Sequence, residues 1–306
     1  MSTSWMQQST IGLLLPLVVC SLAATLLCSI AKGADISHEL GKIKPTQLEE
    51  ISGLAASRQN ANVLWLHNDG DSGQLFAVST SGKLAALVTC PVEIEDLEDI
   101  AIGPGPEKGV DYLYLGDIGD NNERRREIRV VRFAEPDLAG QRGQQLDVDE
   151  AEEFRLTYPD GPHDAEALLV DSVTGDLFIV TKEKQRARVY TVAADGLKDQ
   201  AVAKLTAAGK LDVDEVSAGA ISPDGSHISL RREARGWLWN REAGESVAAA
   251  LERKPTKVPV RGKRQGPNGE SIAFSPTGKS YYTVSEGKKQ AVYEFDLPAM
   301  PGDSGR

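Results

Sequence analysis

Acidic side chains recur at the start of short apolar runs, and they are the residues of this sequence best suited to chemistry. Five runs share the pattern, with one polar residue just before the run and a second polar residue two places later. The first set is Glu50, Asp96, Asp164, Glu215 and Asn268. The second set is Ser52, Glu98, Glu166, Ser217 and Glu270. Because the side chains of a strand repeat every two residues, both sets are expected on one face.

A third set of polar residues follows the next apolar run of each unit, where an antiparallel neighbour of the first strand would end. The five segments are His67 to Asp69, Gly116 to Asn121, Thr181 to Glu183, Arg231 to Glu233 and Ser285 to Gly287. Turn residues would explain one or two such segments, whereas polar residues in all five units indicate a lined site. We therefore expect the three sets to surround one opening of the fold, which we call the mouth.

Carboxylates gathered in this way repel one another and raise their own pKa values unless a cation or a basic side chain compensates them. Ca²⁺ is a suitable cation, because it takes about six to eight oxygen ligands from carboxylates, amides and carbonyls. We predict Ca²⁺ as a cofactor. Its predicted ligands are Glu98, Glu166, Glu270 and Asp117. The alternative is that the acids cap backbone amides and pair with basic residues, which would serve the fold alone.

Other polar residues of the expected mouth have predicted roles in catalysis or binding. The predicted catalytic residues are Glu98, Glu166 and His163. The predicted ligand-binding residues are Lys182, Arg231 and Asp69. The two basic side chains would hold an anionic group, and His163 could move a proton. For His163 the competing interpretation is a simple hydrogen bond within its loop.

The repetition places these residues on the first strand of a repeated β-unit. Units of about 40–50 residues built from strands alone favour an all-β fold, the β-propeller, in which each first strand lines a central channel. We predict five four-stranded blades, with residues 202–206 as the fourth strand of the third blade. The fifth unit lacks a fourth strand, and residues 37–43 are expected to pair there and close the ring. Two packed sheets are the alternative fold, and a sixth unit hidden in the polar insertion 135–152 is the alternative count.

Charge and the N-terminal residues narrow the class of protein. The formal net charge of -11 argues against nucleic acid as a partner, because phosphate binding needs a basic face. Residues 11–30 are mostly apolar, and we interpret residues 1–34 as a signal peptide that directs the chain to the periplasm or the medium. An uncleaved membrane anchor over residues 11–30 is the alternative. Residues 35–298 are expected to form one propeller domain, followed by a disordered tail over residues 299–306.

Three stretches carry a resemblance to a known family. They are Leu113 to Asn121, Tyr158 to Gly161 continued by Asp164 to Leu168, and Thr181 to Glu183. These stretches resemble a family of uncharacterised secreted bacterial β-propeller proteins, over most of residues 45–297. That family implies no established activity. More distantly, the acid-led strands are similar to those of phytase-like and gluconolactonase-like propellers, which implies Ca²⁺ at the channel and hydrolysis of phosphoesters or lactones.

Together these observations predict an extracytoplasmic propeller with an acidic site at the mouth of its channel. The first functional hypothesis is a Ca²⁺-dependent hydrolase of phosphoester or lactone type, acting on a small anionic ligand. The alternative is a binding scaffold without catalysis, whose partner would be an extracytoplasmic protein or a glycan. A membrane would be contacted only through the N-terminal segment, if that segment stays uncleaved.

Overall fold

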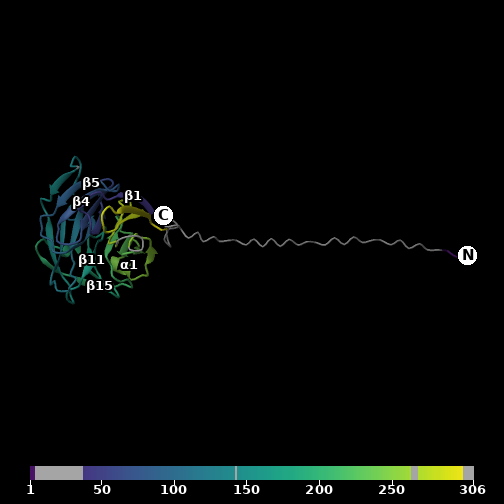
Figure 1. The fold of residues 1–306 in the computed structure, drawn as a ribbon. Coiled ribbons are helices and arrows are strands. Elements are labelled where there is room, and N and C mark those ends of the chain that lie inside the picture. The colour runs from purple at the N-terminus through teal and green to yellow at the C-terminus, as the bar shows by residue number, and fades with distance from the viewer. Residues whose placement is uncertain (4–36, 142, 263–267, 299–306) are drawn as a thin grey trace. The chain divides into compact units, whose positions relative to one another are not determined.

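The computed structural model describes residues 1–3, 37–141, 143–262 and 268–298 (Figure 1). Within these residues the chain forms five sheets of a β-propeller and almost no helix. The two short helical segments are α1 (Val247–Leu251) and a 3-10 turn (Ala194–Gly196). The prediction of an all-β propeller with five blades is therefore confirmed.

Each blade is an antiparallel sheet whose strands follow one another outward from the centre. Blade one contains β2 (Ile51–Ala56), β3 (Val63–Asn68), β4 (Gln74–Ser79) and β5 (Leu84–Thr89). Blade two contains β6 (Leu97–Pro104), β7 (Asp111–Asp117), β8 (Ile128–Ala134) and β10 (Glu152–Thr157). Blade three contains β11 (Ala165–Val170), β12 (Leu177–Thr181), β13 (Arg188–Val192) and β15 (Thr206–Lys210). Blade four contains β16 (Ala218–Ile221), β17 (His227–Arg232), β18 (Arg235–Asn240) and β19 (Thr256–Val258). Blade five contains β20 (Ser271–Phe274), β21 (Ser280–Val284), β22 (Ala291–Asp296) and β1 (Ser37–Lys42).

The inner strands form the ring that positions the expected site. β2, β6, β11, β16 and β20 each contact the inner strand of the next blade, and β20 contacts β2. Apolar side chains of neighbouring blades pack between the sheets, so that each described hydrophobic cluster belongs to two adjacent blades. Burying both faces of every sheet explains why the inner strands are buried along most of their length, without an exposed alternate position.

The first described strand closes the ring, as the sequence predicted. β1 pairs antiparallel with β22, from Ser37 opposite Phe295 to Lys42 opposite Ala291 (Figure 1). The register shifts between Glu39 and Gly41, where β1 passes over the turn between β4 and β5. Pairing the outer edge of the last blade with the start of the chain covers an edge that would otherwise be open to other chains.

Gly41 allows this close passage, and we expect Gly41→Ala to destabilise the propeller. A Cβ at this position would collide with the backbone of Ser81, which cannot rotate away as a side-chain end can. Such overpacking costs about 1–3 kcal/mol, measurable by urea unfolding. Gly196→Ala is the control, because its Cβ would lie 3.5 Å from Val192 in ordinary contact. Equal unfolding midpoints for both variants would contradict the expectation.

Two strands differ from the sequence prediction because they pair with a blade other than their own. The insertion 135–152 contains β9 (Gln144–Asp147), which adds to β5 of blade one in parallel and forms no sixth blade. The strand expected over residues 202–206 is in fact two strands. β14 (Val202–Lys204) adds in parallel to β10 of blade two, and only β15 completes blade three.

Some predictions fall on residues outside the described ranges. Apart from residues 1–3, the expected signal peptide or anchor lies outside them, and so does the expected C-terminal tail. Across the described ranges, no helix is long and apolar enough to cross a membrane.

Candidate functional site

Irregular pairing at the start of three inner strands shapes the mouth. The register between inner and second strand shifts around Ser52 in blade one, Glu98 in blade two and Glu166 in blade three. A bulge of this kind turns a side chain away from the regular alternation of a strand. The Ser52 hydroxyl donates a hydrogen bond of 2.5 Å to the carbonyl of Glu98, which joins the first two bulges. The second set of polar residues is thus presented by bulges where the blades meet.

Three carboxylates converge at this mouth. One oxygen from each of Asp69, Asp96 and Glu98 lies within 4.8 Å of the other two. Asp69 follows β3, whereas Asp96 and Glu98 stand at the start of β6. The Leu97 N–H donates to the carbonyl of Gly70 at 2.8 Å, which holds the two segments side by side. Backbone pairing between blades one and two therefore builds the acidic trio.

Gly119 gives the trio its space. A Cβ on Gly119 would fall between the carboxylate oxygens of Asp96 and Glu98 and collide with both. The Gly119 N–H donates to the carbonyl of Asp96 at 3.3 Å, so the loop after β7 closes over the acids with its backbone alone. The residue is glycine because its backbone approaches the carboxylates closely.

The electrostatics of the mouth show how closely its acids are gathered. Burial, and then the negative charges of Glu166 and Asp69, raise the pKa of Glu98 to about 10. Burial and the neighbouring Asp69 also raise the pKa of Asp96. In the described structure the carboxylate of Glu98 makes no ion pair with a basic side chain, although it is only 4% exposed. A hard cation would relieve this repulsion.

A second pair of acids shares one lysine beside the trio. The Lys182 ammonium forms an ion pair with Glu166. Burial disfavours the charge of Lys182, but Glu166, Glu270 and Glu98 outweigh it and raise the lysine pKa. Burial raises the pKa of Glu166 to about 8 against the opposing effect of Lys182, and burial with Glu286 raises that of Glu270 to about 8. Glu98, Glu166, Glu270 and Lys182 are thus brought together, whereas their predicted roles stay predictions.

Two other predicted residues are held by different partners. The buried carboxylate of Asp117 accepts from Arg125 at 2.9 Å and Arg129 at 2.6 Å, and also from the Asp96 N–H at 2.9 Å. Asp117 therefore fixes the segment that carries Asp96, and we leave it out of the ligand set proposed below.

Arg231 is fully buried and points into the fold. Its guanidinium donates to the carbonyls of Ser271 and Arg261, both at 2.7 Å, and to that of Glu233. Burial lowers its pKa to about 9, with a smaller opposing effect of Glu270. Both terminal nitrogens are bonded to carbonyls and the side chain is fully buried, so Arg231 is also left out of the proposed site. It joins blades four and five near the mouth.

His163 lies in an aromatic cluster at the edge of blade three. Its Nε2 is 2.8 Å from the Tyr190 hydroxyl and 3.2 Å from Asp160, and its Nδ1 is 3.5 Å from Glu183. The ring packs edge-on against Tyr158 and stacks on Tyr190. Both ring nitrogens therefore face polar side chains of blade three, as expected for a histidine fixed by its surroundings.

Sequence reasoning missed Asp99, which is fully buried at the centre of the ring. One of its carboxylate oxygens accepts from the N–H of Leu168 at 3.0 Å and from that of Gly219 at 3.4 Å. The other accepts from the Ile100 N–H at 2.9 Å. Asp99 thus ties together the inner strands of blades two, three and four. A second consecutive acid inside an apolar strand was the available signal, because an unpaired charge is costly there.

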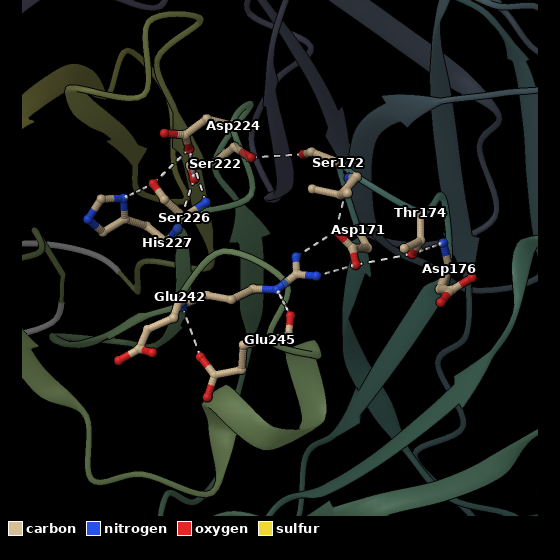
Figure 2. A network of polar contacts seen from close by, with 12 residues as sticks. Asp171, Ser172, Thr174, Asp176, Ser222, Asp224, Ser226, His227, Glu242 and Glu245 are labelled. Atoms are coloured by element: carbon tan, nitrogen blue, oxygen red, sulfur yellow. Dashed lines mark hydrogen bonds and ion pairs between the residues drawn. The ribbon is translucent and has the colours of Figure 1, made fainter.

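A separate polar network lies at the other ends of these strands (Figure 2). Asp171, directly after β11, accepts two hydrogen bonds from the Arg241 guanidinium at 2.7 and 2.9 Å. Ser172 donates to the carbonyl of Ser222 at 2.8 Å and so links blades three and four. The side chains of Arg241 and Asp171 are only 7% and 3% exposed. This buried pair stabilises the face opposite the mouth.

Comparisons with known proteins add no family to this geometry. No family model matches the sequence, and no curated protein is significantly similar to it. The solved structures that are similar include "Structure of U3-55K", with a TM-score of 0.42 and 12% identity over 81% of this chain and 80% of that one. Another is "Crystal Structure of Mitotic Checkpoint Complex", with a TM-score of 0.40 and 11% identity over 80% of this chain and 63% of that one. At these values neither likeness transfers an activity or a partner, and the resemblance to phytase-like and gluconolactonase-like propellers stays a prediction.

Proposed function

We propose that this chain is an extracytoplasmic β-propeller that binds Ca²⁺ at its mouth and hydrolyses an ester of phosphoester or lactone type in a small anionic compound. The convergence of Asp69, Asp96 and Glu98 carries the proposal. The extracytoplasmic location rests on the apolar character of residues 11–30.

The residues of the trio fit a hard cation in three respects. They offer carboxylate oxygens, which are the ligands that Ca²⁺ prefers. Within the described chain the buried Glu98 forms no ion pair with a basic side chain, so a cation would relieve its repulsion by the neighbouring acids. Gly119 leaves open the space between two of the carboxylates. Asp69, Asp96 and Glu98 would therefore hold the cation.

The neighbouring residues define what the chain itself can contribute to hydrolysis. Bound Ca²⁺ supplies a Lewis acid that polarises an ester oxygen and favours ionisation of water. Lys182 is positively charged and only partly covered, so it can donate hydrogen bonds to an anionic group of the substrate. Glu166, with a pKa near 8, can accept and release a proton near neutral pH. Lys182 and Glu166 would thus combine substrate binding with proton transfer.

Thermal unfolding with and without Ca²⁺ tests the proposal. A saturating concentration of about 100 times Kd stabilises the folded state by about 2.7 kcal/mol, which raises Tm by roughly 5–10 °C. We expect Glu98→Gln to abolish this rise while changing the metal-free stability by less than about 1 kcal/mol. With a pKa of about 10 the side chain is already neutral near pH 7, and Gln has nearly the same shape.

The exposed Glu107, in the turn after β6, provides the matched control Glu107→Gln, which should keep the full response to Ca²⁺. Turnover of a panel of phosphoesters and lactones is then measured with the wild type, Glu98→Gln and Glu166→Gln. A wild type whose Tm is insensitive to Ca²⁺ would refute the metal site. Ca²⁺ binding without turnover of any ester would instead support a binding scaffold for a protein or glycan.

A further inference from the structure

A polar hollow of about 790 Å³ adjoins the mouth along the rim of blade three. Two of its lining residues border the acids of the mouth: Lys182 and Asp164, whose charges both act on Glu166. Its basic lining residues are Lys182, Lys184, Arg186, Arg188 and Lys210. Four acidic residues also line it, so basic residues outnumber acidic ones by one in a chain whose net charge is -11. The hollow therefore differs in charge from the acidic mouth that it borders.

Most charges of the hollow are already paired. Arg186 pairs with Asp212 at 2.9 Å, and Arg188 pairs with Asp160 at 2.9 Å and with Glu183 at 3.2 Å. Of the acidic lining residues, Glu183 is thus neutralised, and Glu215 pairs with Arg232. The lining also contains the acids Asp164 and Glu123. Asp164 accepts a hydrogen bond of 2.9 Å from the backbone N–H of Asp120, and Glu123 is exposed.

Lys184 and Lys210 are the basic residues left over. Both are exposed, and neither forms an ion pair with any residue that the structure describes. Lys184 lies in the loop between β12 and β13, and Lys210 ends β15 opposite Arg188, so two strands of one blade present them to the same hollow. The amides of Asn121 and Gln185 add neutral hydrogen-bond donors. This lining can receive an anionic group.

We propose that the ligand of the mouth carries two anionic groups, one for the cation held by the acidic trio and one for Lys184 and Lys210 in the rim hollow. The inference rests on the proposed function, because the first group needs the bound cation. The acids of the mouth repel any anionic group that the cation does not hold. The lysines of the rim therefore determine where the remaining negative charge of the ligand lies. Lys182 borders both places and lies beneath the connecting part of the ligand.

Two sugar phosphates that differ by one phosphate test the inference. We expect the Ca²⁺-loaded protein to bind fructose 1,6-bisphosphate at least tenfold more tightly than fructose 6-phosphate, as measured by isothermal titration calorimetry. The difference should disappear in Lys184→Gln/Lys210→Gln, which keeps its affinity for Ca²⁺. The control is Lys254→Gln/Lys257→Gln in blade four, which removes the same charge from exposed positions and should retain the preference.

The outcomes separate the two proposals. Equal affinities of the wild type for the two sugar phosphates, with Ca²⁺ bound, would overturn the rim hollow and leave the metal site standing. An equal loss in both double variants would also overturn it, because net charge alone would then explain the preference. If Ca²⁺ does not bind, the proposed function fails. The inference is then overturned as well, because the first anionic group needs the bound cation.

Discussion

Gly119→Ala is expected to weaken Ca²⁺ binding by about 10–100-fold, the range seen when residues that orient metal ligands are altered. The added methyl group would occupy the space between the carboxylates of Asp96 and Glu98 and push them apart. The atoms that must move are the ends of side chains, so the fold should tolerate the change. We expect the metal-free protein to unfold within about 1 kcal/mol of the wild type.

Isothermal titration with Ca²⁺ and urea unfolding measure these two effects separately. Gly196→Ala is again the control, because its Cβ would only touch Val192 in ordinary contact. It should leave both Ca²⁺ affinity and stability unchanged. Unaltered Ca²⁺ affinity in Gly119→Ala would place the cation elsewhere, and a loss of several kcal/mol of stability would mean that Gly119 supports the fold and not the site.

Asp171→Asn should lower the free energy of unfolding by about 3–5 kcal/mol at neutral pH, because it leaves the buried Arg241 without its anion. Burial opposes ionisation of Asp171, but hydrogen bonds from Arg241 and from the Val173 N–H outweigh it and hold the pKa below its ordinary value. A lowered carboxylate pKa stabilises the folded state above the ordinary value of about 4. This contribution is lost as the pH falls through the folded-state pKa, so the variant and the wild type should converge in acid.

Urea unfolding at several pH values provides the measurement. Asp195→Asn is a matched control at an exposed position of blade three and should stay within about 0.5 kcal/mol of the wild type. The Ca²⁺-induced rise in Tm should persist in Asp171→Asn, because Asp171 follows the end of β11 whereas Glu166 of the mouth stands at its start. A stability difference that is independent of pH would show that packing, and not the charge of Asp171, is responsible.

The sequence predicted the ring because each unit repeats the same order of buried strand, turn and strand, and because the last unit lacked one strand. Strand pairing beyond the unit was not predictable in this way. Residues 202–204 have the polarity of a strand whichever blade they join, and their parallel pairing with β10 depends on how close the two blades lie. The parallel pairing of β9 with β5 of blade one likewise depends on how close the two blades lie.

The candidate site was predictable only as far as spacing determines direction. Glu98, Glu166 and Glu270 occupy the same position in their units, and this repetition predicted that they meet at one mouth. The sequence could not show that Glu98 faces the mouth whereas Asp99 is buried among the inner strands. The register shift at Glu98 breaks the alternation of side chains at these two acids. Nor could the sequence show that Asp117 meets two arginines or that Arg231 meets three carbonyls, since those partners come together only in the folded chain.

The pairing of β1 with β22 also governs when this protein can finish folding. Contacts between residues far apart in the sequence form slowly, because the entropy of the intervening chain is lost before the contact stabilises it. Blades one and two each receive an outer strand from the segment of the blade that follows. Neither sheet is therefore complete until part of the next blade has formed. Blade five is completed by β1, which precedes every other described strand in the sequence. The ring should therefore assemble in chain order and close last, and until then β22 offers an unpaired edge on which a second copy of the chain could pair.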